Sequence, residues 1–133
     1  MKYLLDTNIC IYIIKKKPEE VLRRLIRHDI SGIGISSITL SELEYGIEKS
    51  SQRDRNKLAL AEFLAPLTIL PYDDNAAAVY GRVRALMEKE GTIIGPLDML
   101  IAAHAMSLKA ILVTNNQEEF ERVSGLKVEN WCV

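Results

Sequence analysis

The sequence predicts a single α/β domain whose central parallel sheet is covered by helices on both faces. Short apolar runs rich in β-branched residues alternate along the chain with longer segments of helical periodicity. That alternation is typical of parallel sheets joined by crossover helices. The 133 residues are 48% hydrophobic and 26% charged, which suits one core, and we expect one domain over residues 1–133.

The first part of the chain predicts a strand, two helices and a second strand. Lys2–Leu5 is short and apolar, and the helix-capping residue Asp6 follows it. A short apolar helix is expected over Ile9–Ile14, and Pro18 begins an amphipathic one. The second strand is expected within Gly32–Ile38 because β-branched residues recur there.

The next segment predicts a helical arm. Thr39–Glu42 fits the S/T-x-x-E capping box, so a helix is expected to begin there and to reach about Glu48. A polar break at Ser50–Gln52 separates it from a longer helix over Arg53–Leu64. We expect the two helices to form the arm together.

The rest of the chain continues the alternation of strands and helices. The expected elements are, in order, a strand over Leu67–Leu70, a helix over Asn75–Glu90 capped by Asp73 or Asp74, a helix that begins at Pro96, a strand over Ala110–Val113, a short helical turn that ends at Phe120, and an edge strand over Leu126–Val128.

Three acidic residues stand where strands give way to helices. Asp6 follows the first strand, Glu42 follows the second, and Asp98 opens the Pro96 helix among apolar neighbours. Right-handed crossovers bring such junctions to one edge of a parallel sheet, where open α/β sheets bind ligands. Crowded carboxylates raise one another's pKa values, and a divalent cation such as Mg²⁺ removes that repulsion. The pattern therefore predicts a metal site.

Each of these acids also has a purely local explanation. Asp6 could cap the helix that follows it, and Glu42 could complete the capping box that Thr39 begins. Asp98 could gain about 0.3–1 kcal/mol from the dipole of its own helix. None of these roles requires the three acids to share one edge of the sheet, and we favour the metal site.

Four short motifs link the chain to a known family. In order they are Tyr3-Leu4-Leu5-Asp6-Thr7-Asn8, Ser41-Glu42-Leu43-Glu44-Tyr45-Gly46, Gly95-Pro96-Leu97-Asp98-Met99-Leu100-Ile101-Ala102 and Val113-Thr114-Asn115-Asn116. They resemble the motifs of PIN-domain ribonucleases, specifically the VapC toxins, and the resemblance runs from Tyr3 to Trp131. It implies a PIN-like α/β/α sandwich with a central parallel sheet and a helical arm.

The resemblance assigns the metal ligands to three acids, Asp6, Glu42 and Asp98. Many family members have an aspartate where this chain has Asn116, whose neutral amide is a weaker ligand. We expect Glu119, about one helical turn further on, to complete the site directly or through water, with Glu118 as the less favoured choice. Whether one or two metal ions bind stays open.

Several polar residues are expected to orient these ligands or to contact phosphate. They are Thr7, Asn8, Thr114, Asn115 and Asn116, all of which also form ordinary turns and caps. His104 lies about 120° around its helix from Asp98, so we expect it to be structural or exposed.

The resemblance implies a toxin endoribonuclease that depends on Mg²⁺ or Mn²⁺ and is encoded beside an inhibitory antitoxin. The expected reaction is hydrolysis of a structured RNA such as tRNA, which leaves 5′-phosphate and 3′-hydroxyl ends. The expected partners are the RNA, the antitoxin and a second copy of the chain. No segment resembles a membrane span or a signal peptide, so a cytoplasmic protein is expected.

Two other classes of protein fit part of the pattern. A phospho-accepting receiver domain needs adjacent acids after its first strand and a lysine after its last, but this chain has Thr7-Asn8 and Asn115-Asn116 there. A non-enzymatic interaction module would use the apolar helices between Ile9 and Leu64 to bind a partner. The net charge of −1 also differs from that of a typical nucleic-acid binder, but the complete acidic motifs favour the enzyme.

Overall fold

The computed structural model of the chain describes all 133 residues and has a five-stranded parallel sheet at its centre. The strands are β1 (Tyr3–Leu5), β2 (Ile33–Ser36), β3 (Thr68–Leu70), β4 (Ile111–Val113) and β5 (Val128–Glu129). They lie in the order β3-β2-β1-β4-β5, and every pairing is parallel. The chain builds one side of the sheet first and then crosses β1 to build the other, so a topological switch point lies between β1 and β4.

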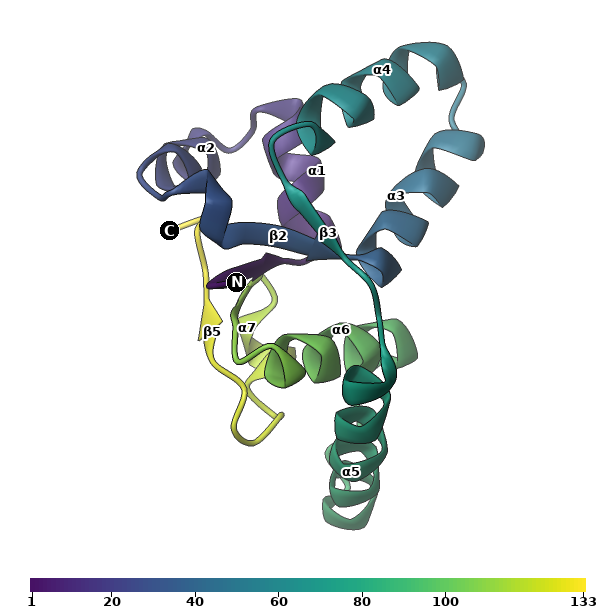
Figure 1. Cartoon of the computed structure of the whole chain (residues 1–133), viewed down its shortest axis with the longest axis vertical. Helices are drawn as coiled ribbons and strands as arrows, with labels where there is room; N and C mark the ends of the chain where they lie inside the picture. Colours follow the sequence, from purple (N-terminus) through teal and green to yellow (C-terminus); the bar gives the residue numbers. More distant parts are fainter.

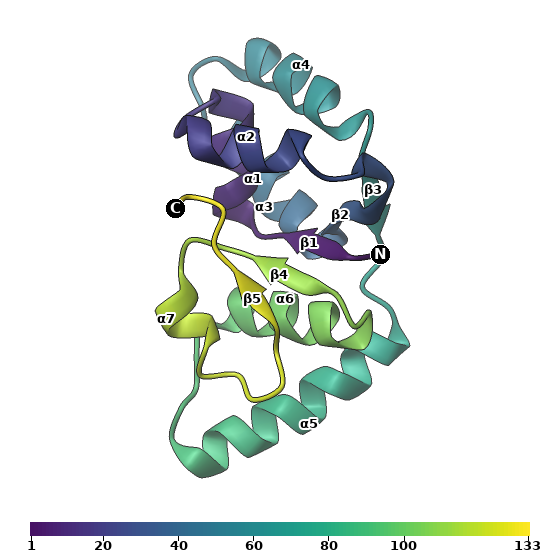
Figure 2. The same cartoon turned by 90° about the vertical axis from the view of Figure 1, so that its left-hand side faces the viewer.

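Helices cover both faces of this sheet (Figures 1 and 2). They are α1 (Thr7–Lys15), α2 (Glu19–Ile26), α3 (Ser37–Glu48), α4 (Arg53–Leu64), α5 (Asp74–Glu90), α6 (Pro96–Ser107) and α7 (Gln117–Phe120), with a 3₁₀ turn, η1, over Ile30–Gly32. Helices α1 to α4 lie on one side of the sheet and α5 and α6 on the other. The predicted α/β/α sandwich is confirmed, and α3 and α4 form the predicted helical arm (Figure 1).

Alternate residues of β1 belong to two separate hydrophobic cores. Tyr3 and Leu5 pack with residues of α1 to α4, whereas Leu4 packs with residues of α5 and α6. Successive side chains of a strand point to opposite faces of its sheet, so a strand buried on both faces is apolar throughout. None of the seven helices combines the length and the apolar character that a membrane crossing requires.

The ends of α5 agree with the sequence. The carboxylate of Asp73 accepts a hydrogen bond from the Ala76 N–H at 3.0 Å and so provides the N-cap. Gly91 ends the helix with a φ of 71°, a left-handed conformation that glycine adopts without strain. Of the two predicted caps, Asp73 is therefore the one used.

The predicted start of α3 is wrong. The helix begins at Ser37, and Ser36 is its N-cap, because the Ser36 hydroxyl accepts a hydrogen bond from the Ile38 N–H at 3.0 Å. Ser36 still has the extended backbone of β2, as an N-cap requires, whereas Thr39 lies inside the first turn with a buried hydroxyl. Glu42 lies in the second turn, so the capping box does not explain its presence.

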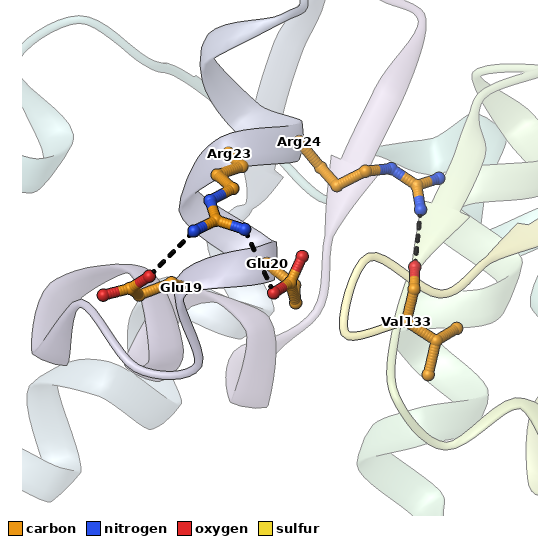
Figure 3. Close-up of polar contacts among 5 residues, drawn as sticks. All are labelled: Glu19, Glu20, Arg23, Arg24 and Val133. Atoms are coloured by element: carbon orange, nitrogen blue, oxygen red, sulfur yellow. Dashed lines mark hydrogen bonds and ion pairs between the residues drawn. The ribbon is translucent and has the colours of Figure 1, made fainter.

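The C-terminal tail packs against α2. Arg24 donates a 2.8 Å hydrogen bond to the backbone carbonyl of Val133 (Figure 3) and lies 3.9 Å from the carboxylate of Glu129. The buried Trp131 indole stacks on the imidazole of His28 with ring centroids 4.7 Å apart. The C-terminal tail thus lies on the side of the sheet that α1 to α4 cover.

Candidate active site

Asp6 lies at the carboxyl end of β1, beside the topological switch point. It caps α1 by accepting a hydrogen bond from the Ile9 N–H at 2.9 Å, and it is only 5% exposed. Burial raises its pKa from 3.8 to about 6, against hydrogen bonds from Thr114 and Ile9, and the charge of Glu42 adds to the increase. Asparagine or serine would cap the helix without this penalty, so the cap alone does not explain a carboxylate here.

Glu42 approaches the site from α3. Its Oε1 accepts a 2.7 Å hydrogen bond from the Thr7 hydroxyl, which comes directly after Asp6. This contact joins the first turn of α1 to the second turn of α3. The expected proximity of Asp6 and Glu42 is therefore present, and Thr7 connects them.

Asp98 lies in the first turn of α6, where Pro96 occupies the first helical position. Burial raises its pKa from 3.8 to about 7, and the negative charges of Glu119, Asp6 and Glu42 add to the increase. Asp98 is thus within electrostatic reach of all three other acids that the sequence singles out.

Glu119 reaches the same place from α7. Its Oε1 accepts a hydrogen bond from the Gly95 N–H at 3.2 Å, and its Oε2 accepts one from the side-chain amide of Asn116. A Cβ atom at Gly95 would lie 3.8 Å from carboxylate oxygens of both Asp98 and Glu119. Glu118 is exposed and makes no such contact, so the geometry favours Glu119 as the fourth acid.

Three of the five predicted supporting residues contact the acids. Thr7 binds Glu42, Thr114 is buried beside Asp6, and Asn116 donates to Glu119. The Thr114 hydroxyl also accepts a hydrogen bond from the backbone N–H of Asn116 at 2.9 Å, which shapes the turn after β4.

The other two supporting residues do not contact the acids. Asn115 donates instead to the hydroxyl of Tyr12 on α1, at 2.8 Å. Asn8 is exposed and makes no side-chain hydrogen bond within the chain. The sequence motifs include both residues, but the spacing of the motifs does not reveal which neighbour each side chain meets.

The four carboxylates have no basic partner. None of Asp6, Glu42, Asp98 and Glu119 forms a salt bridge with lysine, arginine or histidine. No three acidic, histidine or cysteine side chains form a ready-made metal cluster either. Mg²⁺ prefers carboxylate oxygens and is commonly held by one or two of them together with water, so the donor set fits a hydrated divalent cation.

The chain is similar to known proteins over almost its whole length. Residues 3–126 match the family model of the PIN domain. The "tRNA(fMet)-specific endonuclease VapC" of Salmonella typhimurium is 46% identical over 132 residues, which are 99% of either chain. The "Ribonuclease VapC2" of Haemophilus influenzae is 49% identical over 131 residues, which are 98% of either chain.

Solved structures of VapBC complexes also contain chains that are similar to this one over almost its whole length. The DNA-bound VapBC structure from Salmonella typhimurium contains a chain of 46% identity that superposes with a TM-score of 0.94 over 99% of both chains. The VapBC2 structure from Rickettsia felis, bound to a promoter DNA fragment, contains one of 42% identity with a TM-score of 0.91 over 98% of this chain and 99% of that one.

Proposed function

Because this chain belongs to the PIN-domain family, among its VapC ribonucleases, we propose that it is the toxin of a toxin-antitoxin pair and hydrolyses tRNA with the help of a divalent metal ion. The observation that carries the proposal is the meeting of four acids at one edge of the sheet. The pKa of Asp98 rises to about 7 through burial and through the charges of Glu119, Asp6 and Glu42. Carboxylates without a basic partner at a topological switch point favour binding of a cation.

The proposed ligands are Asp6 and Asp98, with Glu42 and Glu119 bound directly or through water. When bound, Mg²⁺ or Mn²⁺ supplies charge neutralisation and a water of lowered pKa to the hydrolysis of a phosphodiester. Thr7 holds the carboxylate of Glu42, and Thr114 holds that of Asp6, so that both keep their orientation. Water, not the 2′-hydroxyl, would attack phosphorus and the 3′-oxygen would leave with a proton, so the products would carry 5′-phosphate and 3′-hydroxyl ends.

The proposed substrate is tRNA(fMet), because the names of two relatives specify this tRNA. The VapC proteins of Salmonella typhimurium and Shigella flexneri are each called "tRNA(fMet)-specific endonuclease", and each is 46% identical to this chain. Purified protein should cleave tRNA(fMet) in Mg²⁺ and leave elongator tRNAs intact, and an excess of EDTA should stop the reaction. Equal cleavage of all tRNAs would contradict the substrate, and cleavage in EDTA would contradict the metal requirement.

The proposed protein partner is an antitoxin, in keeping with the VapBC complexes among the structural neighbours. A groove of about 400 Å³ between α1, α3 and α4 is lined by Ile11, Leu43, Gly46, Ile47 and Leu60, and Glu42 lies at it. We expect an apolar antitoxin segment to fill the groove and a basic side chain to reach the acids. Both proteins would act in the cytoplasm, where the tRNA substrate of the toxin is found.

The chain is also proposed to form a homodimer. Leu86 on α5, Ile93 in the following loop and Leu97 on α6 are 44%, 46% and 46% exposed. Side chains of this size favour burial against a partner surface. Size-exclusion chromatography with light scattering should give twice the mass of the chain, and a monomeric mass would contradict the proposal.

A further inference from the structure

A buried hydrogen bond joins the two helices that carry Glu42 and Asp98. Nδ1 of His104, on α6, lies 2.8 Å from the hydroxyl of Ser36, across a sequence separation of 68 residues. His104 is 1% exposed and Ser36 is fully buried. Ser36 is the N-cap of α3, so the contact fixes the end of α3 that lies nearest the sheet.

No other side-chain hydrogen bond connects α6 to β2 or α3. Asp98 lies six residues before His104 on α6, and Glu42 lies six residues after Ser36 on α3. A shift of α3 along α6 would therefore change the separation of the two carboxylates. Displacements of about 1 Å are enough to lower the rate of an enzyme a hundredfold.

Packing alone does not explain a histidine at this position. Nε2 of His104 is buried without a hydrogen-bond partner, and an unpaired buried polar atom is destabilising. Leucine would fill similar space without that cost. Burial lowers the pKa of His104, although the charge of Asp73 opposes the shift, so the ring is neutral and its Nδ1 can pair with the hydroxyl of Ser36.

We infer that His104 is a positioning residue, whose contact with Ser36 holds α3 against α6 so that Glu42 and Asp98 bind one cation together. This role rests on the proposed metal-dependent function. His104 itself touches neither the acids nor the substrate, and its effect passes through the N-cap of α3.

Three substitutions of His104 test the role. Asparagine can place a polar atom where Nδ1 lies, glutamine places one nearer to Nε2, and leucine removes both. Two measurements are needed on the protein without RNA: its dissociation constant for Mn²⁺ from electron paramagnetic resonance, and the hydrogen exchange of the Ile38 amide. Met87→Ala on α5 is the matched control, since Met87 is 2% exposed and packs in the core between α5 and α6 without a side-chain hydrogen bond to α3.

We expect His104→Leu to weaken Mn²⁺ binding about tenfold and to speed exchange at Ile38, because supporting residues of metal sites have effects of this size. His104→Asn should recover most of the affinity, whereas His104→Gln should not. Met87→Ala should lower the melting temperature without changing either measurement. If His104→Leu does not fold, the difference between asparagine and glutamine decides alone.

Equal losses in the asparagine and glutamine variants would show a packing role and overturn the inference. So would unchanged Mn²⁺ affinity in His104→Leu beside a wild type that binds the ion normally. A wild-type protein that binds no Mn²⁺ would instead overturn the proposed metal-dependent function, and the role of His104 with it.

Discussion

The Thr7 hydroxyl donates a 2.7 Å hydrogen bond to Oε1 of Glu42, across a sequence separation of 35 residues. The bond sets the direction of the Glu42 carboxylate beside Asp6. Thr7→Val keeps the shape of the side chain and removes the bond, so it should reduce the rate of tRNA cleavage about tenfold. Thr68→Val, the same change at an exposed position on β3, should leave the rate unchanged. Full activity in Thr7→Val would show that Glu42 needs no such support.

The fourth acid is tested by comparing two adjacent glutamates. Glu119→Gln should weaken Mg²⁺ activation because Glu119 is the acid on α7 that raises the pKa of Asp98. Glu118→Gln, the exposed control, should behave like wild type. Adding Asn116→Asp to Glu119→Gln should restore activation, since it returns a carboxylate beside the same site. If a titration with Mg²⁺ showed weaker activation of Glu118→Gln than of Glu119→Gln, Glu118 would be the ligand instead.

Stability should fall as the pH rises through the range in which Asp6 and Asp98 ionise. Both carboxyls titrate near 3.8 when unfolded, whereas their folded pKa values are about 6 and about 7. The folded chain therefore binds more protons between about pH 4 and pH 7, and its free energy of unfolding decreases across that window. The loss continues through the folded pKa of Asp98 and levels off about one pH unit above it.

Urea unfolding in EDTA at pH 5 and pH 8 measures this loss. Asp98→Asn should lose less stability between the two pH values than wild type, by roughly 1–2 kcal/mol after allowance for screening by water. Asp74→Asn, at an exposed position in the first turn of α5, should match wild type. Mg²⁺ should restore stability to wild type at pH 8, and equal losses in wild type and Asp98→Asn would contradict the electrostatic origin.

The groove beside Glu42 offers a test of antitoxin binding that leaves the fold intact. Gly46 lines the groove, and a Cβ atom added there meets no other atom within 4 Å. Gly46→Leu should therefore fold and keep its ribonuclease activity, but it should escape inhibition by the proposed antitoxin. Gly81→Leu on α5 has the same open surroundings away from the groove, and it should remain inhibited. Normal inhibition of Gly46→Leu would place the antitoxin elsewhere.

Local patterns were sufficient to predict the sheet and the proximity of the acids. The strands are short apolar runs, Asp6 directly follows β1, Glu42 lies in the second turn of the helix after β2, and Asp98 lies in the first turn of α6. Asn116 also lies beside the proposed fourth acid, because its amide contacts Glu119. These features depend on neighbours close in sequence or on the regular geometry of the fold.

Long-range contacts account for what the sequence did not predict. Ser36 and Thr39 are both acceptable N-caps by sequence, and Ser36 is the one that ends β2 and meets His104. The helical angle correctly separates His104 from Asp98, but nothing in the spacing shows that its partner is Ser36. The contact of Asn115 with Tyr12 depends in the same way on how the elements pack.

The central claim is that four acids, one directly after β1 and the others on α3, α6 and α7, cleave RNA through a divalent metal ion. The most direct test maps the ends of tRNA(fMet) fragments produced in Mg²⁺ by wild type and by Asp98→Asn. We predict 5′-phosphate and 3′-hydroxyl ends from wild type, and a rate at least about a hundredfold lower from a stably folded Asp98→Asn. Fragments that end in 2′,3′-cyclic phosphate, or undiminished cleavage by Asp98→Asn, would contradict the claim.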